Sequence, residues 1–254
     1  MKDNFYIGWE AQASPRHRKL MRAVALVLFV LGITSALALA LPQKLIGSSV
    51  FEWGTVKTFS GVLKVQPYPH LLVLRPGAVS TQPSFSTYYL VAPFKFGLDR
   101  EKLASLDGKS VSLQGTLIYR GDQTMVEAVP DSIRADEQPA TAIVGPESIP
   151  LGRQTLLGEI VDSKCFLGVM NPGQLLPHRA CAIRCISGGI PPILLVRSTK
   201  GAALHLLLVG ADGRPVNQQV LDLVAEPVQI TGEVVRQGGL LILRADPKDI
   251  LRTP

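Results

Sequence analysis

Two stretches of the chain decide its fold: SVSLQGTLIYRGDQTMVEAVP at residues 110–130 and PVQITGEVVRQGGLLILRADP at residues 227–247. The second follows the first at a spacing of 117 positions, and the match continues without gaps over residues 88–133 and 205–250. In both copies apolar and polar residues alternate, which is typical of half-buried β-strands. Each copy also has a glycine-containing turn between two strands, which predicts a β-hairpin. The sequence therefore predicts an internal repeat made of β-strands.

The elements around each hairpin indicate a small barrel. A strand with a central glycine comes first in each copy, at residues 58–65 and 154–161. A short apolar stretch, at residues 98–106 and 216–223, separates the middle strands from the hairpin. This order resembles that of the OB-fold, a small five-stranded barrel with a helix between its third and fourth strands. We expect a mainly β fold with two tandem OB-like barrels; one large sandwich built from both copies is the alternative.

The domain boundaries follow from these elements. We place the first barrel at residues 50–133 and the second at residues 151–252, with a Cys/His insertion at residues 162–192. Residues 134–150 contain three prolines and mixed polarity, which is typical of a linker. The sequence therefore predicts two barrels joined by a connection of that length.

Residues 23–41 form an uncharged apolar run ahead of both barrels. At 1.5 Å per residue a helix of this length extends over roughly 28 Å, enough to cross the hydrocarbon core of a bilayer. The basic residues directly before it are Arg16, Arg18, Lys19 and Arg22. Because basic flanks stay in the cytoplasm, we expect a single-pass protein of a bacterial inner membrane, with a cytoplasmic tail at 1–22 and periplasmic barrels. The alternative is a cleaved signal peptide, with Ala38-Leu39-Ala40 as its cleavage site.

The tail contains large apolar side chains, among them Phe5, Tyr6 and Trp9. Exposed side chains of this size need a surface to cover them. Tyr6 and Trp9 suit the lipid interface, where such residues are enriched; docking of the tail on a partner membrane protein is the other interpretation. We therefore expect membrane lipid and a membrane protein complex as partners, with these three residues as candidate docking residues.

The two copies differ by an insertion in the second. The interval from Gly158 to His205 is 47 positions, whereas the interval from Gly61 to Tyr88 is 27. All three cysteines of the chain lie within the longer interval. The insertion is therefore the part of the sequence in which specific chemistry is expected.

The cysteines and one histidine of the insertion have a spacing that suits metal binding. His178, Cys181 and Cys185 occupy positions i, i+3 and i+7 of an expected helix over residues 178–186, so they share one face. Cys165 follows a strand and is expected to approach that face. Three thiolates and an imidazole form a complete tetrahedral ligand set for Zn(II) or Cu(I). The sequence predicts a metal ion of unknown identity, zinc or copper, at these four residues.

Charged residues next to the expected ligands are candidates for supporting roles: Asp162, Lys164, Arg179 and Arg184. The three cations would help to keep the thiols deprotonated. Three other interpretations of the cluster stay open. These are a closed structural zinc site, a disulfide from Cys165 to Cys181 or Cys185 with one free thiol, and a thiol-redox site.

The run GEIVDSKC (158–165), followed by HRACAIRCISGGIPP (178–192), resembles a widespread family of exported, largely uncharacterised bacterial OB-like domains. The pattern of that family is a strand ending in D-x-x-C, then H-x-x-C-A-x-x-C, then G-x-P. The residues of this chain that match the pattern are Asp162, Cys165, His178, Cys181, Cys185, Gly189 and Pro191. The resemblance covers about residues 155–196. It implies a site in an exported domain and names no reaction.

Composition argues against several functions. The second barrel has a single aromatic residue, Phe166, and half of the net charge of +6 lies in residues 1–41. The first barrel has ten aromatic residues between Phe51 and Tyr119, but its charge is balanced and we expect it outside the cytoplasm. Single-stranded nucleic acid requires both stacking platforms and a basic groove, so we expect no nucleic-acid partner. No haem-attachment, phosphate-loop or nucleophile motif is present, so no catalytic residue is assigned. We expect a metal-binding accessory subunit or assembly factor of a membrane redox or metal-handling system; the alternatives are a non-catalytic scaffold and a thiol-redox protein.

Overall fold

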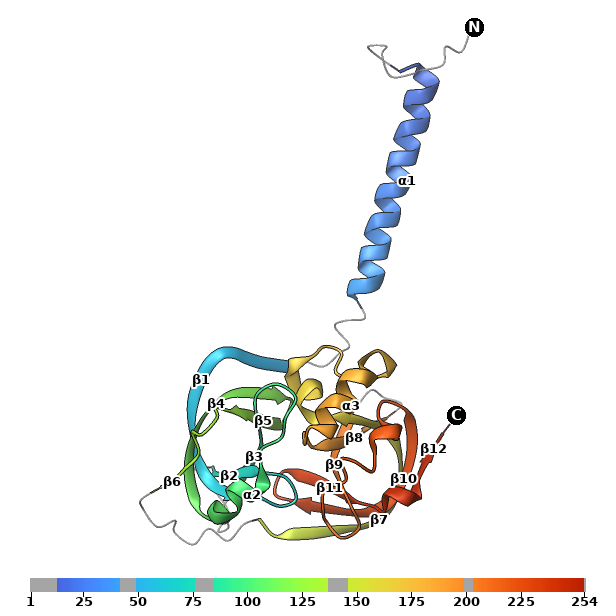
Figure 1. Cartoon of the computed structure of the whole chain (residues 1–254). Helices are drawn as coiled ribbons and strands as arrows, with labels where there is room; N and C mark the ends of the chain where they lie inside the picture. Colours follow the sequence, from blue (N-terminus) through green and yellow to red (C-terminus); the bar gives the residue numbers. More distant parts are fainter. Residues whose placement is uncertain (1–12, 42–48, 76–84, 137–145, 199–202, 254) are drawn as a thin grey trace. The chain divides into compact units, whose positions relative to one another are not determined.

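The computed structural model describes residues 13–41, 49–75, 85–136, 146–198 and 203–253. It divides into two compact units, residues 1–47 and residues 48–254. The first unit contains helix α1 (Pro15–Ala40), shown in Figure 1. Ser14 caps the helix because its Oγ accepts a hydrogen bond from the backbone N–H of His17, and Pro15 needs no partner in the first turn. No residue of α1 is buried, and the helix is long and apolar enough to span a membrane.

The helix α1 begins ahead of the predicted apolar span. The span predicted at residues 23–41 lies within α1 except for Leu41, which caps its C-terminus. Residues 15–22, which the sequence assigns to the tail, are also helical, because the Ser14 cap begins the helix ahead of the apolar run. The candidate docking residues Phe5, Tyr6 and Trp9 lie outside the described residues, so their role stays a prediction.

Five strands close the first barrel. They are β1 (Ser49–Lys64), β2 (His70–Leu74), β3 (Phe85–Val91), β4 (Ser110–Arg120) and β5 (Gln123–Ala128). Their order is β1-β2-β3-β5-β4, and antiparallel pairing of β4 with β1 closes the barrel. The pair β3–β5 is parallel. Between β3 and β4 lie the short helices α2 (Arg100–Leu103) and η2 (Ala104–Leu106).

The second barrel has the same strand plan. Its strands are β7 (Ser148–Asp162), β8 (Pro192–Arg197), β9 (Ala203–Val209), β10 (Pro227–Gln237) and β11 (Leu240–Arg244). The order β7-β8-β9-β11-β10 closes through antiparallel pairing of β10 with β7, and β9–β11 is the parallel pair. The short helix η5 (Leu221–Leu223) precedes β10, while η6 (Pro247–Asp249) and β12 (Ile250–Arg252) follow β11. The prediction of a mainly β fold with two OB-like barrels is confirmed, and the single sandwich is excluded.

In each barrel, a glycine in the first strand lies close to the backbone of the second strand. A Cβ at Gly61 would lie 2.5 Å from the carbonyl oxygen of Leu72, and a Cβ at Gly158 would lie 2.6 Å from that of Leu195. No side chain fits at these separations, so only glycine allows the close approach of the neighbouring backbone. The first strand of each barrel can therefore pair on both sides and close the barrel.

The connection between the barrels is shorter than predicted. Strand β6 (Arg134–Ala135) pairs with β4 next to Val111 and Ser112. Strand β7 begins at Ser148, which pairs with Gln237. Both ends of the linker predicted at residues 134–150 are therefore strand, because their backbone groups find hydrogen-bond partners at the barrel edges.

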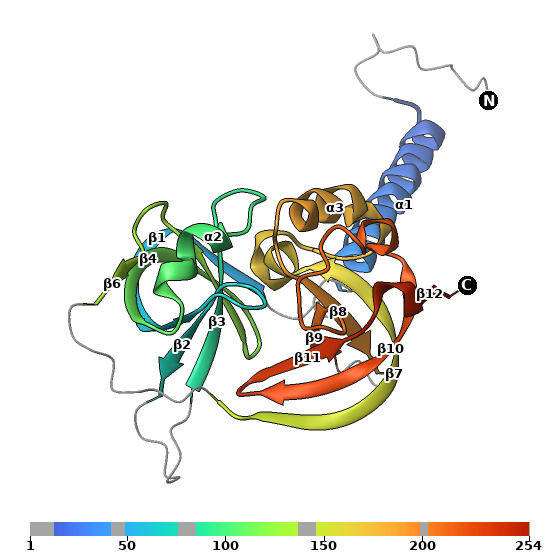
Figure 2. The ribbon, with the colours of Figure 1, turned by 60° about the horizontal axis from the view of Figure 1, so that its bottom comes forward.

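The two barrels lie next to each other and share an apolar core (Figure 2). The first barrel contributes Tyr89, Ile118 and Met125, and the second contributes Cys165 and Cys185 among others. Each barrel also has a separate core of its own. The shared core therefore contains two of the predicted metal ligands.

The insertion lies between β7 and β8. It consists of η3 (Cys165–Val169), η4 (Leu176–His178) and α3 (Arg179–Ser187). The helix α3 ends at Gly188, and Gly189 has a φ of 100°, which favours glycine. The backbone N–H of Ser163 donates to the carbonyl oxygen of Pro191 at 3.1 Å, which closes the insertion at its base.

Candidate metal centre

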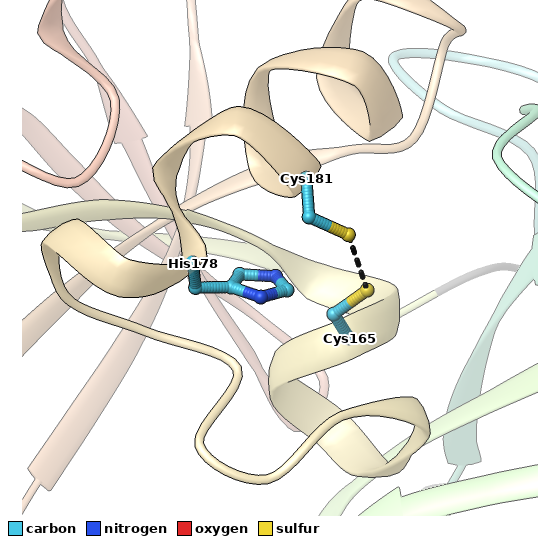
Figure 3. A group of neighbouring side chains, drawn as sticks. All are labelled: Cys165, His178 and Cys181. Atoms are coloured by element: carbon cyan, nitrogen blue, oxygen red, sulfur yellow. Dashed lines mark hydrogen bonds between the residues drawn. The ribbon is translucent and has the colours of Figure 1, made fainter.

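Three cysteines and one histidine lie close together between η3 and α3. Figure 3 shows Cys165, His178 and Cys181 of this group. The Sγ atom of Cys165 lies 3.9 Å from Sγ of Cys181 and 3.9 Å from Sγ of Cys185. The ligand atoms of Cys165, His178 and Cys181 lie within 4.8 Å of one another. A second group with the same limit contains Asp162, Cys165 and Cys185. The structure thus places the other three predicted ligands around Cys165. His178 and Cys185 belong to different groups of ligand atoms.

The Asp162 carboxylate contacts two of the predicted ligand residues, Cys165 and His178. Its carboxylate is fully buried and accepts a hydrogen bond from the backbone N–H of Cys165 at 2.8 Å. Its other oxygen lies 3.0 Å from Nε2 of His178, which is also buried. A histidine that gives one ring nitrogen to a carboxylate keeps the other, here Nδ1, for a metal. The sequence prediction that Asp162 supports the ligands fits this arrangement.

The first barrel contributes a cation that the sequence did not indicate. Lys95 lies in the segment after β3, and its Nζ donates to Sγ of Cys181 at 2.8 Å and lies 3.9 Å from Sγ of Cys185. The hydrogen bond to Cys181 raises the pKa of Lys95, so the side chain stays charged. Lys95 and Cys181 are 86 positions apart. No local pattern predicts the contact, which arises only when the two barrels pack.

The loop that carries Lys95 is held against the insertion. The backbone N–H of Gly97 donates to the carbonyl oxygen of Gly188 at 2.9 Å. A Cβ at Gly188 would lie 2.1 Å from the carbonyl oxygen of Lys95. Two glycines therefore let the loop backbone approach the end of α3 closely.

Lys164 has a different role from the one predicted. Its Nζ donates to the carbonyl oxygens of Ala92 at 2.9 Å and of Phe94 at 2.7 Å, and it pairs with Glu127. The residue is 1% exposed. The ammonium is therefore used to hold the Lys95 loop, and the prediction that it keeps the thiols deprotonated is corrected.

The two arginines of α3 also do not act as predicted. Arg179 pairs with Glu226 and donates to the carbonyl oxygen of Asp222 at 3.0 Å. Arg184 is exposed on α3. Arg179 thus serves the contact of α3 with the segment before β10, because its long side chain reaches acceptors there. Lys95 occupies the position next to the thiols that was predicted for these cations.

The thiols influence each other's ionisation. The hydrogen bond with Cys185 raises the pKa of Cys165, and burial and the carboxylate of Asp162 act in the same direction. The same hydrogen bond lowers the pKa of Cys185, with the help of the Lys95 ammonium and against the effect of burial. Of the two thiols, Cys185 therefore loses its proton more readily than Cys165.

The sulfur separations suit a metal better than a disulfide. All three cysteines are free, and the distances of 3.9 Å are far above the roughly 2.05 Å of an S–S bond. Two thiolates bound at about 2.3 Å in a tetrahedral site lie about 3.8 Å apart. The separations on both sides of Cys165 therefore match those of a metal–thiolate site, which the cysteines are positioned to form.

Comparisons with known proteins identify no family. No family model and no curated protein matches the chain. Among solved structures, the wild-type single-stranded DNA binding protein of Thermus aquaticus matches at 13% identity and a TM-score of 0.23, covering 82% of this chain and 88% of that one. A deletion mutant of that protein matches at 13% identity and a TM-score of 0.22, covering 82% and 89%. Values this low support no argument about ligands.

These neighbours correct one expectation. Composition led to the expectation of no nucleic-acid partner, whereas the two structures named above are described as single-stranded DNA binding proteins. That exclusion is corrected and withdrawn. It gave the balanced charge of the first barrel more weight than its ten aromatic residues between Phe51 and Tyr119, which are side chains of the kind that stack on bases.

Proposed function

We propose that this chain is a single-pass membrane protein whose second barrel binds one soft metal ion, as an accessory subunit or assembly factor of a membrane redox or metal-handling system. The ligands are the thiolates of Cys165, Cys181 and Cys185, with Nδ1 of His178 as the fourth donor. The observation that carries the proposal is the convergence of three free thiols, with Cys165 Sγ at 3.9 Å from both others.

The surroundings of the thiols favour a metal over the alternatives. Asp162 orients His178 through Nε2 at 3.0 Å, an arrangement typical of histidines that bind metals through the other nitrogen. Lys95 donates to a sulfur, which compensates part of the negative charge that several thiolates bring together. Soft thiolate ligands select Zn(II) and Cu(I) over hard cations.

The membrane part of the proposal rests on α1 and its flank. The helix is apolar, carries no buried residue and is long enough to span a bilayer. Its basic first turns favour a cytoplasmic N-terminus, which puts both barrels in the periplasm of a bacterial inner membrane. The resemblance to exported OB-like domains points to the same compartment. A bound metal would protect the thiols from oxidation there.

Metal analysis of the full chain in detergent tests the proposal. The protein is purified anaerobically with a reductant, loaded with Zn(II) or Cu(I), dialysed, and assayed by mass spectrometry of metals and by thiol titration. We expect about one metal ion per chain and thiols that become reactive only after chelation. Loss of binding in Cys181→Ser, with retention in Ala180→Ser on the same helix, places the ion at the cluster.

A chain that holds no metal after reduction, and that shows one reactive thiol when it is purified without reductant, contradicts the proposal in favour of a disulfide. His178→Asn and His205→Asn form a second matched pair, because His205 lies on β9 outside the cluster. Only the His178 variant should bind metal more weakly. Unfolding of the chain on chelation would assign the metal a structural role, whereas exchange with a retained fold supports metal handling.

A further inference from the structure

Lys95 is a cation of one barrel placed at the thiols of the other. Its Nζ lies 2.8 Å from Sγ of Cys181 and 3.9 Å from Sγ of Cys185. The side chains of Arg179 and Lys164 are bonded elsewhere, to Glu226 and to Glu127. Among the described residues, Lys95 is therefore the cation whose side chain contacts the sulfurs.

The position of Lys95 is set by the backbone around it. Lys164 holds the carbonyl oxygens of Ala92 and Phe94, and Gly97 is hydrogen-bonded to Gly188. These contacts lie on both sides of Lys95 in the chain. The packing of the two barrels thus holds the backbone on both sides of Lys95 in place, which positions its ammonium at the sulfurs.

The sulfur spacing alone does not select a metal. Thiolates bound at about 2.3 Å lie about 3.8 Å apart in a tetrahedral site and about 4.0 Å apart in a planar three-thiolate site. The two separations around Cys165 are 3.9 Å and fit both arrangements. The Lys95 ammonium next to the ligands, by contrast, changes the affinities for ions of different charge by different amounts.

We propose that Lys95 biases this site toward a monovalent soft ion, copper(I), relative to zinc(II); this inference rests on the proposed metal site. Three thiolates with copper(I) carry two negative charges, whereas the same thiolates with zinc(II) carry one. The ammonium therefore stabilises the copper(I) complex by one additional unit of charge interaction. At about 4–5 Å this interaction corresponds to a factor of about ten to a hundred in relative affinity for a half-buried group.

Competition titrations of the full chain in detergent test the inference. The zinc(II) and copper(I) dissociation constants are measured anaerobically against chelators of known affinity for wild type, Lys95→Met and Lys95→Arg. We expect Lys95→Met to shift the ratio of the two constants toward zinc by about ten- to a hundredfold, and Lys95→Arg to keep it close to wild type. Lys102→Met is the matched control, because the Lys102 side chain is 83% exposed in the same barrel.

The outcomes separate the inference from the proposed function. An unchanged ratio in Lys95→Met, with metal still bound, overturns the role of Lys95 and leaves the metal site in place. A wild-type chain that binds neither ion overturns both. The salt dependence of wild type is a second measurement that requires no substitution: rising ionic strength should lower the preference for copper(I) because it screens the ammonium.

Discussion

The two barrels have the same strand plan and differ in the connection between their first two strands. In the first barrel residues 65–69 join β1 to β2, whereas in the second residues 163–191 join β7 to β8 and form η3, η4 and α3. The longer connection provides the thiols, and the shorter one provides no comparable side chains. The first barrel takes part through a different loop, which brings Lys95 to Cys181. A shared fold therefore supports a site that needs both barrels and is built from elements that the barrels do not share.

The largest effect is expected from Lys164, which joins the barrels. Lys164→Met removes an ammonium that is 1% exposed and leaves Glu127 and two carbonyl oxygens without their partner. The free energy of unfolding should fall by about 3–5 kcal/mol. Denaturant unfolding of the full chain in detergent measures it, with Lys102→Met as the exposed control. Equal stability of the two variants would contradict the role of Lys164 in joining the barrels.

Asp162→Asn tests whether the second barrel holds its ligands through the buried carboxylate. The carboxylate bonds His178 and the backbone of Cys165, and such partners contribute about ten- to a hundredfold to metal affinity. We expect weakening of that size in the chelator competition assay. Asp212→Asn, at an exposed position of the same barrel, should bind as wild type. If both variants bind equally well, Asp162 does not orient the ligands.

Gly188→Ala probes the approach of the Lys95 loop to α3. The added Cβ would lie 2.1 Å from the carbonyl oxygen of Lys95, so one of the two backbones must move. We expect a loss of about 1–2 kcal/mol in stability, together with a smaller difference between the zinc(II) and copper(I) affinities. At Gly239 nothing lies within 4 Å of an added Cβ, so Gly239→Ala is the control. If Gly188→Ala changes neither the stability nor the zinc(II) and copper(I) affinities, the close contact between Gly188 and the Lys95 loop is not required.

The smallest effect concerns pH and one histidine in each barrel. Burial lowers the pKa of His70 on β2 and that of His205 on β9. Each histidine therefore takes up a proton more readily in the unfolded chain, near pH 6.5, than in the folded chain. The unfolded state then binds more protons, so stability is lost as the pH falls below about 6.5, by at most about 1.4 kcal/mol per pH unit for each histidine. Unfolding of His70→Gln between pH 7 and 5.5 should show a weaker pH dependence than wild type, and an unchanged slope would refute the assignment.

The sequence predicted the barrels because their residues obey local rules. Alternation along β4 and β10 and the glycines at 61 and 158 are visible without a structure. The helix of the insertion was predicted for the same reason, since His178, Cys181 and Cys185 follow helical spacing. Their meeting with Cys165 was inferred from chemistry and is present in the structure.

What the sequence missed depends on packing between barrels. Lys95 lies 86 positions before Cys181 and shares no motif with it. Lys164 stands next to Cys165 in the chain, yet its side chain points to the carbonyl oxygens of Ala92 and Phe94. Lys164 caps η3 in a helical conformation, and adjacent residues of a helix do not face the same side, so proximity in sequence misassigned this lysine.

The contact between Lys95 and Cys181 also has a consequence for the order of events during synthesis. Ribosomes make chains from the N-terminus, so the whole first barrel exists before the last cysteine is added. The thiols then meet their charge partner only after the second barrel has folded and docked. The complete charge environment of the thiols is therefore the last part of this cluster to form, and a chain truncated within the second barrel would present thiols that lack their cation.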